Sequence, residues 1–133
     1  MSNRNLAGYR VLIVEDEFFL AADLEDAIDR SGAEIIGPLG DLDSALAQVR
    51  SHVPDLATVD INLGGDLAYP LADALLREHV PFVFASAYEP DEIPARFRNV
   101  PHVVKPYAMD DLIGALASLA GTSEHRRRPE PAN

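Results

Sequence analysis

Short apolar runs alternate along the chain with segments whose apolar residues recur every three or four positions. The runs are rich in valine, isoleucine, leucine and phenylalanine, which is typical of β-strands. The segments between them show the spacing of amphipathic helices. The predicted strands cover residues 11–14, 34–37, 55–60, 81–85 and 102–104. Alternation of this kind predicts an α/β fold.

Glycine, proline and capping residues indicate where the helices begin and end. The first predicted helix begins at Phe18 and stops before Gly32, the second is capped by Asp41 or Asp43 and ends before Pro54, the third begins at Pro70, and the last covers residues 110–120. Between residues 87 and 101, Pro90, Pro94 and Pro101 limit any helix to about two turns around residues 92–97. The Gly-Gly-Asp run at 64–66 is expected to form a flexible loop.

Five strands alternating with five helices through right-handed crossovers predict a doubly wound parallel sheet with helices on both faces. The expected strand order is 2-1-3-4-5, which places a binding site at the carboxyl ends of strands 1 and 3. Residues 10–120 account for this domain, and residues 1–9 are then an N-terminal extension. Residues 121–133 contain consecutive arginines at 126–128 and are expected to be a disordered tail, or alternatively a docking segment for an acidic partner.

Composition narrows the environment and the partners of the protein. The chain of 133 residues carries a net charge of −11, and such an acidic surface repels nucleic-acid backbones. The absence of cysteine excludes disulfides and a cysteine nucleophile, and suits a reducing interior. The sequence shows neither a signal peptide nor an apolar run of about 20 residues. We therefore expect a cytoplasmic protein that binds neither nucleic acid nor membranes.

Charged and polar side chains stand at the carboxyl ends of four predicted strands. Glu15 and Asp16 follow the first strand, Asp60 ends the third, Ser86 follows the fourth, and Lys105 follows the fifth. Because these ends meet at one edge of a parallel sheet, we expect the carboxylates, the hydroxyl and the ammonium group to lie close together. Each residue alone has an ordinary explanation as a turn residue or a helix start. Together they predict that Asp60 accepts a phosphoryl group with the help of a divalent metal.

The role of each residue follows from the chemistry of phosphoryl transfer. The Asp60 carboxylate is a competent nucleophile toward phosphorus, but it repels a phosphate unless a metal bridges the two. The expected metal is Mg²⁺, with Asp16 and Asp60 as direct ligands, Glu15 bound through water, and the backbone carbonyl of Asn62. Lys105 and the hydroxyl of Ser86 would stabilise the charge on the phosphoryl oxygens. Glu17 is expected to belong to the first turn of the following helix instead.

These residues, in this order, resemble the receiver domain of two-component response regulators, and the resemblance covers residues 10–120. Within that family, the run Phe-Ala-Ser-Ala-Tyr at 84–88 is similar to the motif of the FAT GUY single-domain regulators of alphaproteobacteria. Two positions depart from the usual receiver pattern. Gly64 stands where receivers usually have a proline, and Ser86 stands where a threonine is expected.

The resemblance implies a flavodoxin-like fold and a signalling protein that catalyses only its own phosphorylation and dephosphorylation. A histidine kinase or a histidine phosphotransferase would donate the phosphoryl group. Because no output domain fits in 133 residues, a separate protein would bind the output surface, roughly residues 89–120. FAT GUY regulators are associated with stress-response phosphorelays, and this association implies a stress-response role.

Two aromatic positions near the predicted site have two interpretations each. Tyr88, two residues after Ser86, either shields an aspartyl phosphate from water or packs in the core. His102 lies three residues before Lys105, where receivers usually have a switch aromatic, and it either has this regulatory role or packs as an ordinary side chain.

Two other functions fit parts of the sequence. A receiver-like module could bind a partner without phosphorylation, an alternative favoured by Gly64 and by the unusual proline-rich stretch at 87–101. A magnesium-dependent phosphohydrolase of the haloacid-dehalogenase kind would also use Asp60 as its nucleophile. That enzyme, however, requires a second acid two residues later, where this chain has Asn62.

Overall fold

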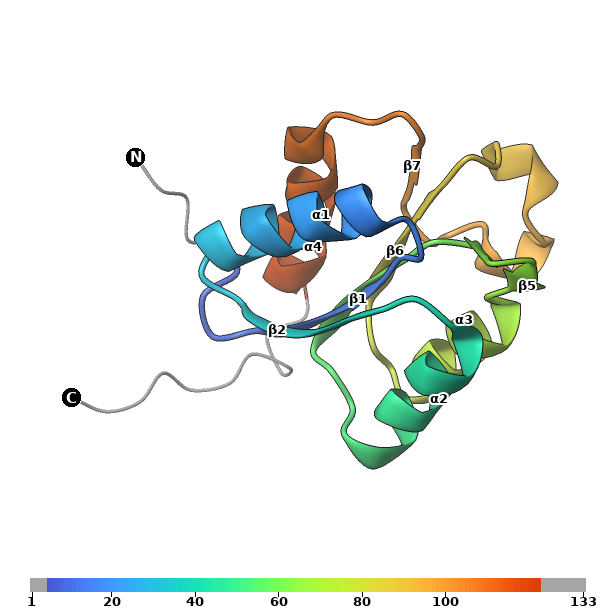
Figure 1. Ribbon diagram of the computed structural model, residues 1–133, viewed down its shortest axis with the longest axis horizontal. Helices are drawn as coiled ribbons and strands as arrows, with labels where there is room; N and C mark the ends of the chain where they lie inside the picture. The colour runs from blue at the N-terminus through green and yellow to red at the C-terminus, as the bar shows by residue number, and fades with distance from the viewer. Residues whose placement is uncertain (1–4, 123–133) are drawn as a thin grey trace.

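Five parallel strands form one sheet in the order β2-β1-β3-β6-β7 in the computed structural model, which describes residues 5–122 (Figure 1). The strands are β1 (Arg10–Val14), β2 (Glu34–Leu39), β3 (Leu56–Val59), β6 (Phe82–Ser86) and β7 (His102–Val104). Strands β4 (Asn62–Leu63) and β5 (Asp66–Leu67) form a separate two-stranded hairpin. When only the five strands of the main sheet are numbered, their order is 2-1-3-4-5, so the predicted fold is confirmed. The predicted tail lies outside the described residues from position 123 onward, and so do its arginines at 126–128.

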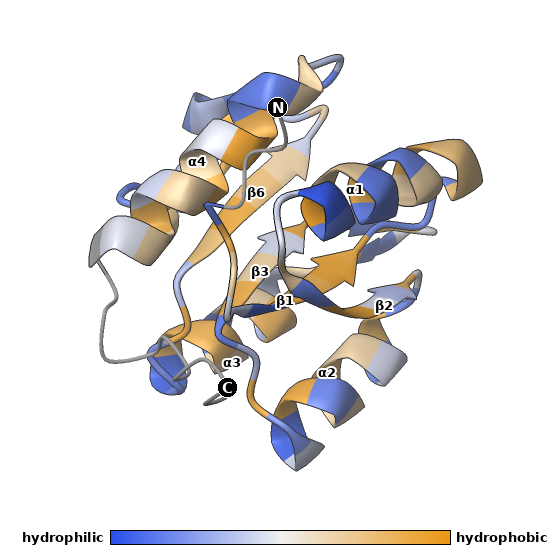
Figure 2. Ribbon diagram, turned by 90° about the vertical axis from the view of Figure 1, so that its left-hand side faces the viewer, coloured by the Kyte–Doolittle hydropathy of each residue, from blue (hydrophilic) through white to orange (hydrophobic). Residues whose placement is uncertain are grey.

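Helices cover both faces of the sheet. The four α-helices found within residues 5–122 are α1 (Phe18–Arg30), α2 (Leu42–Ser51), α3 (Tyr69–Arg77) and α4 (Met109–Thr122). Helices α1 and α4 lie on one face, and α2 and α3 lie on the other (Figure 1, Figure 2). Each face has its own core, because successive side chains of β1 point to opposite sides. No helix in the described part of the chain is long and apolar enough to cross a membrane.

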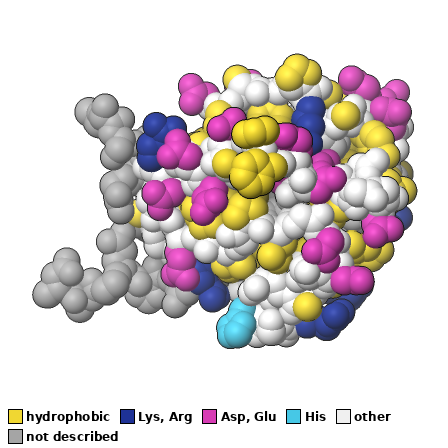
Figure 3. All heavy atoms as spheres, in the orientation of Figure 1, with side chains coloured by type: hydrophobic (Ala, Val, Ile, Leu, Met, Phe, Trp, Pro, Cys, Tyr) yellow, Lys and Arg dark blue, Asp and Glu magenta, His cyan; other side chains and the backbone are white. Residues whose placement is uncertain are grey.

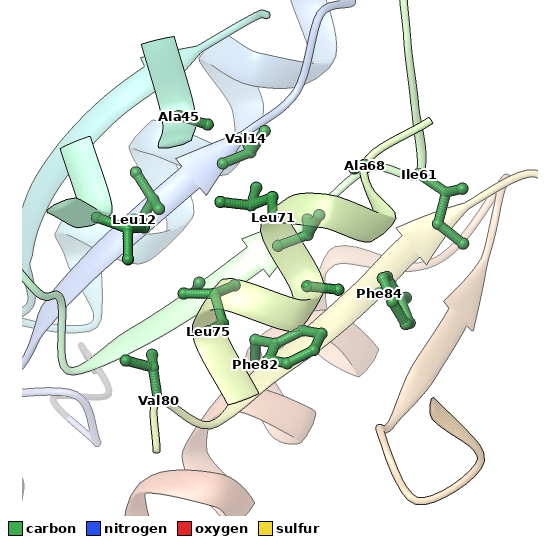
Figure 4. Packing of buried hydrophobic residues seen from close by; sticks show 14 of the residues in the cluster. Leu12, Val14, Ala45, Ile61, Ala68, Leu71, Leu75, Val80, Phe82 and Phe84 are labelled. Atoms are coloured by element: carbon green, nitrogen blue, oxygen red, sulfur yellow. The ribbon is translucent and has the colours of Figure 1, made fainter. Parts of the chain in front are cut away.

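The core on the α2 and α3 face holds the strands in register. Leu71 and Leu75 of α3 are fully buried, and Figure 4 shows them between the side chains of β1 and those of β6. Leu12 of β1 and Phe84 of β6 are likewise fully buried. Burial of each such side chain stabilises the fold by about 1.5–3 kcal/mol relative to exposure. This packing fixes where the carboxyl ends of the strands lie.

Residues 5–9 pack onto the other face of the sheet. Leu6 and Tyr9 are 0% and 5% exposed, and they belong to the core formed with α1 and α4. The hydroxyl of Tyr9 donates a hydrogen bond to the backbone oxygen of Ala120 at 2.9 Å. The segment that we expected to be an N-terminal extension therefore supplies core residues and ties the start of β1 to the end of α4.

The stretch between β6 and β7 differs from the prediction of a fifth helix. It contains two separate 3₁₀ turns, η1 (Pro90–Glu92) and η2 (Ala95–Phe97), and no α-helix. Proline restricts the residue before it to extended backbone, and Ile93, which precedes Pro94, has φ −99° and ψ 140°. Pro94 therefore separates the two turns, where the sequence had suggested about two continuous helical turns.

Aromatic rings anchor this segment in place of a helix. The ring of Phe97 is buried, stacks on Tyr69 with a centroid distance of 5.6 Å, and meets Phe84 edge to face, also at 5.6 Å. Beside them, the guanidinium group of Arg96 donates two hydrogen bonds to the carboxylate of Asp73 in α3, at 3.0 and 3.1 Å. The 3₁₀ segment is thus held against α3 and β6.

The loop expected at 64–66 forms part of a tight hairpin. Strands β4 (Asn62–Leu63) and β5 (Asp66–Leu67) pair antiparallel, and only two residues join them. These are Gly64 and Gly65, with φ values of 62° and 102°. Two-residue hairpin turns of this kind require positive φ at both positions, which glycine adopts without strain.

Candidate functional site

Three carboxylates meet where β1 and β3 end. Val14 and Val59 are paired in register, and the N–H of Asp60 donates to the backbone oxygen of Val14 at 2.9 Å. This pairing brings Asp60 beside Glu15 and Asp16, which follow β1. One oxygen from each carboxylate lies within 4.8 Å of the others. Glu15 and Asp60 are buried, whereas Asp16 is exposed.

Lys105 reaches this cluster from the end of β7. Its Nζ donates a hydrogen bond to Oδ2 of Asp60 at 3.0 Å and another to Oε2 of Glu15 at 3.2 Å. Nζ also lies 3.0 Å from Oε1 of Glu15, but this buried oxygen accepts no hydrogen bond from any described residue. One ammonium group therefore faces two buried carboxylates and a third exposed one nearby.

The cluster has more negative charge than Lys105 can balance. Burial raises the pKa of Glu15 to about 7, and the charge of Asp60 adds to this effect against the hydrogen bonds from Glu17 and Lys105. Burial also raises the pKa of Asp60, again opposed by Lys105. Burial tends to lower the pKa of Lys105, but its bonds to Asp60 and Glu15 outweigh this and raise it. A divalent cation, which prefers oxygen ligands, would relieve this excess, and Oε1 of Glu15, which accepts no hydrogen bond from the described residues, fits such a ligand set.

Two neighbouring polar side chains accept hydrogen bonds from backbone N–H groups and so stabilise the local backbone conformation. Glu17 caps α1, because its carboxylate accepts hydrogen bonds from the N–H groups of Phe19 at 3.3 Å and Leu20 at 2.7 Å. The side-chain oxygen of Asn62 accepts a hydrogen bond from the N–H of Gly65 at 2.8 Å and so stabilises the hairpin turn. The expectation that Glu17 serves the helix is confirmed, with the residue placed at the cap just before the first turn.

Ser86 and His102 form a second, hydrogen-bonded part of the site. The side chain of Ser86 is buried at the end of β6, and its Oγ accepts a hydrogen bond from the N–H of Tyr88 at 3.2 Å. Oγ also lies 3.1 Å from Nε2 of His102 in β7. The ring of His102 meets Phe84 edge to face, with a centroid distance of 6.3 Å. The sequence indicated His102 as a regulatory or packing residue but did not reveal this contact.

A cavity of about 170 Å³ joins the two parts of the site. Its lining consists of Asp60, Asn62, Ser86, Ala87, Tyr88 and Lys105. The structure thus brings the predicted acceptor, lysine and hydroxyl together around one space. Tyr88 is half-buried and also borders a larger hollow of about 510 Å³, formed with the hairpin, α3 and the 3₁₀ segment.

Comparisons with known proteins agree with this geometry. Residues 11–117 match the family model described as the response regulator receiver domain. The chain belongs to the response regulator receiver family. It is similar to the transcriptional regulatory protein PdtaR of Mycobacterium tuberculosis, with 32% identity over 114 residues that cover 80% of this chain and 54% of PdtaR. The chain thus spans about half the length of this curated relative.

Two solved structures are also similar to this chain. SdrG from Sphingomonas melonis Fr1 is 37% identical, with a TM-score of 0.69 and coverage of 84% of this chain and 97% of SdrG. The response regulator PhyR from Brucella abortus is 28% identical, with a TM-score of 0.70 and coverage of 93% of this chain and 55% of that chain.

The structure accounts for one departure from the usual receiver pattern. Gly64 has φ 62°, and its N–H donates a hydrogen bond to Oδ2 of Asp16 at 2.9 Å. A proline here could neither adopt this φ nor donate the bond, since its ring fixes φ near −65° and removes the N–H. Gly64 therefore orients the exposed carboxylate of Asp16 at the edge of the acidic cluster.

Proposed function

We propose that this receiver accepts a phosphoryl group on Asp60 and thereby changes its binding to a protein partner. The observation that carries this proposal is the contact between the buried Asp60 carboxylate and the Nζ of Lys105, 3.0 Å apart, in a cavity that Ser86 also lines. A nucleophile, a fixed cation and a hydroxyl donor therefore surround one space.

The chain's own residues have separate tasks in the transfer. An oxygen of Asp60 forms the new bond to phosphorus while the bond from phosphorus to the donor histidine breaks, and the electron pair leaves with the imidazole nitrogen. Lys105 balances charge on the phosphoryl oxygens, and Ser86 donates a hydrogen bond to one of them. The product is an aspartyl phosphate, and water later hydrolyses it.

The acidic cluster is the proposed magnesium site of this chemistry. Asp16 and Asp60 would bind the ion directly, Glu15 through water, and Asn62 through its backbone carbonyl. Bound Mg²⁺ supplies positive charge that lowers the repulsion between Asp60 and the phosphoryl group. This assignment is supported by the three carboxylates that lie close together with the single ammonium group of Lys105.

The phosphoryl donor is proposed to be a histidine kinase or a histidine phosphotransferase. Phe18 and Phe19, at the start of α1, are 76% and 74% exposed and lie beside the acidic cluster in the sequence. Phe19 borders a hollow of about 520 Å³ that Lys105 and Tyr107 also line. Acidic side chains are spread over the face shown in Figure 3, with hydrophobic side chains among them. This apolar surface next to the site suits a protein donor that brings its histidine to Asp60.

The output is proposed to pass through residues 89–120, which include the 3₁₀ segment, β7 and most of α4. Tyr88 links the cavity to this region, because it also borders the hollow beside η1. The likeness to PhyR, one structure of which is described as a stress response regulator, supports a role in stress signalling. PhyR is 27% identical to this chain in that structure.

Phosphorylation with a small donor tests the acceptor. Acetyl phosphate and Mg²⁺ should add one phosphoryl group to the wild-type protein, measured by intact mass, and none to Asp60→Asn. The matched control is Asp66→Asn, which changes an exposed aspartate of the nearby hairpin and should be phosphorylated like the wild type. An adduct that persists in Asp60→Asn would place the acceptor elsewhere.

Two further measurements, together with intact mass, separate the alternative functions. A phosphorylation-independent binding module would show no adduct and no binding of beryllofluoride, which mimics a phosphoryl group on aspartate. A phosphohydrolase would turn over many equivalents of a phosphate ester. The amide of Asn62, at the position of the required second acid, cannot act as a general acid, which disfavours this enzyme.

A further inference from the structure

The hydroxyl oxygen of Ser86 has two close nitrogen neighbours. The N–H of Tyr88 donates to Oγ at 3.2 Å, and Nε2 of His102 lies 3.1 Å from the same atom. A backbone N–H can only donate, so this contact occupies one of the two acceptor positions of the hydroxyl. Whether the second contact uses the other acceptor position or the hydroxyl proton depends on where His102 carries its own proton.

The surroundings of His102 select one form of its ring. Burial lowers the pKa of His102, which favours the neutral imidazole with a single N–H, and the charge of Glu89 only partly opposes this. The other ring nitrogen, Nδ1, is buried and has no hydrogen-bond partner among residues 5–122. A proton on Nδ1 would leave a buried donor unpaired, whereas a proton on Nε2 donates to Ser86. Because an unpaired buried acceptor costs less than an unpaired buried donor, these surroundings favour the ring with its proton on Nε2.

With this tautomer, both acceptor positions of Ser86 Oγ are filled by donors. The hydroxyl proton of Ser86 is then the only part of the group left to form a hydrogen bond. Ser86 lines the same cavity as Asp60 and Lys105. We propose that His102 is a positioning residue that fixes the Ser86 hydroxyl as a hydrogen-bond donor toward a phosphoryl group on Asp60.

This inference rests on the proposed function. It adds a residue that does not itself line the cavity formed by Asp60, Ser86 and Lys105. His102 acts through Ser86, and its ring is kept in place by the edge-to-face contact with Phe84. Orienting the hydroxyl before the phosphoryl group arrives removes the need to reorganise it during transfer. A serine that is free to rotate would spend part of its time as an acceptor, pointing its oxygen lone pairs at the phosphoryl oxygens.

The tautomer can be measured directly in the metal-free protein. Nitrogen chemical shifts of ¹⁵N-labelled histidine distinguish a proton on Nε2 from one on Nδ1, and the signals of His102 are identified by their loss in His102→Phe. We expect the Nε2–H form at pH 7.5. An Nδ1–H form would overturn the inference, because Ser86 would then donate its proton to His102.

Two substitutions separate the hydrogen bond from the packing of the ring. His102→Phe keeps an aromatic ring against Phe84 but removes the donor, whereas His102→Gln keeps an N–H donor without the ring. With Mg²⁺ present, beryllofluoride binding should weaken about five-fold in His102→Phe, the effect of one hydrogen bond, and stay near wild type in His102→Gln. Thermal unfolding of each variant shows whether the fold is retained.

A double-mutant cycle with Ser86→Ala completes the test. If His102 acts through Ser86, His102→Phe should have no further effect on beryllofluoride binding once the hydroxyl is absent. An equal loss with and without Ser86 would overturn the inference and assign His102 to packing alone. Failure of the wild-type protein to bind beryllofluoride would overturn the proposed function together with the inference, so the two failures are distinguishable.

Discussion

The two flanks of the site differ in the interactions among their side chains, which are repulsive on one flank and attractive on the other. On one flank, the ends of β1 and β3 force Glu15, Asp16 and Asp60 together around a single lysine. On the other flank, stacked aromatic rings hold the segment between β6 and β7 in place of a helix. The first arrangement is electrostatically unfavourable without a bound cation, whereas the second contributes favourable burial.

The two flanks also differ in how freely their parts can move. Carboxylates held close by strand pairing cannot move apart, so their repulsion is relieved only by a proton or a cation. The aromatic flank consists of short turns joined through prolines, and the backbone hydrogen bonds within residues 89–100 join residues three positions apart, so they do not tie this segment to the sheet. We expect the acidic flank to set how tightly metal and phosphate bind, and the aromatic flank to change shape in response.

The largest effect on this comparison is expected from Phe97→Ala. Phe97 is 2% exposed and contacts both Tyr69 and Phe84, so its removal should lower the free energy of unfolding by about 3–5 kcal/mol. Phe18→Ala, at a side chain that is 76% exposed, should change it by less than about 0.5 kcal/mol. Urea denaturation measures both. A small loss in Phe97→Ala would mean that the rings do not hold the segment.

The next largest effect concerns Glu15 and pH. In the folded protein its pKa is raised to about 7 from an ordinary value of 4.5, so the folded state binds this proton more tightly than the unfolded chain. The associated stability is fully present below pH 4.5 and is lost as the pH rises to about 7. Glu15→Gln keeps a neutral group at all pH values. At pH 8 without metal it should therefore be more stable than wild type, by roughly 1–3 kcal/mol.

Magnesium should reverse this ranking. The ion binds the folded wild-type protein and stabilises it by mass action, and Glu15→Gln should gain less because it has lost one carboxylate. Thermal unfolding of both proteins between pH 5 and 8, with and without Mg²⁺, measures the two effects. If Glu15→Gln is less stable than wild type at pH 8 without metal, the acidic flank is not strained as described.

The acidic flank could be predicted from the sequence, because a parallel sheet necessarily brings the ends of its strands to one edge. Asp60, Glu15 and Lys105 needed no knowledge of side-chain packing to be placed together. The aromatic flank could not be predicted in this way, since proline positions showed only that a long helix was excluded. That Phe97 would stack on Tyr69 depends on contacts between residues 28 positions apart, which no local pattern reveals.

Two further details depend on the three-dimensional arrangement of the chain. The contact of Ser86 with His102 depends on the register of β6 and β7, in which Phe84 is paired with His102. The role of Gly64 depends on its positive φ and on the orientation of its N–H toward Asp16. The sequence showed that Gly64 departs from the usual receiver pattern, but it could not show which contact the glycine makes in place of the proline.

The smallest expected effect is a change in the rate of dephosphorylation in Tyr88→Ala. Tyr88 borders both the cavity that Asp60 and Lys105 line and the hollow beside the 3₁₀ segment, so it lies where the two flanks meet. If its ring limits the approach of water to the phosphorus atom, removal should speed loss of the phosphoryl group by roughly three- to ten-fold. The backbone N–H that donates to Ser86 is unchanged by the substitution. Tyr88→Phe keeps the ring and should dephosphorylate at the wild-type rate, which is measured by intact mass after removal of the donor. A Tyr88→Ala protein that loses stability but keeps the wild-type rate would assign the ring to the aromatic flank alone.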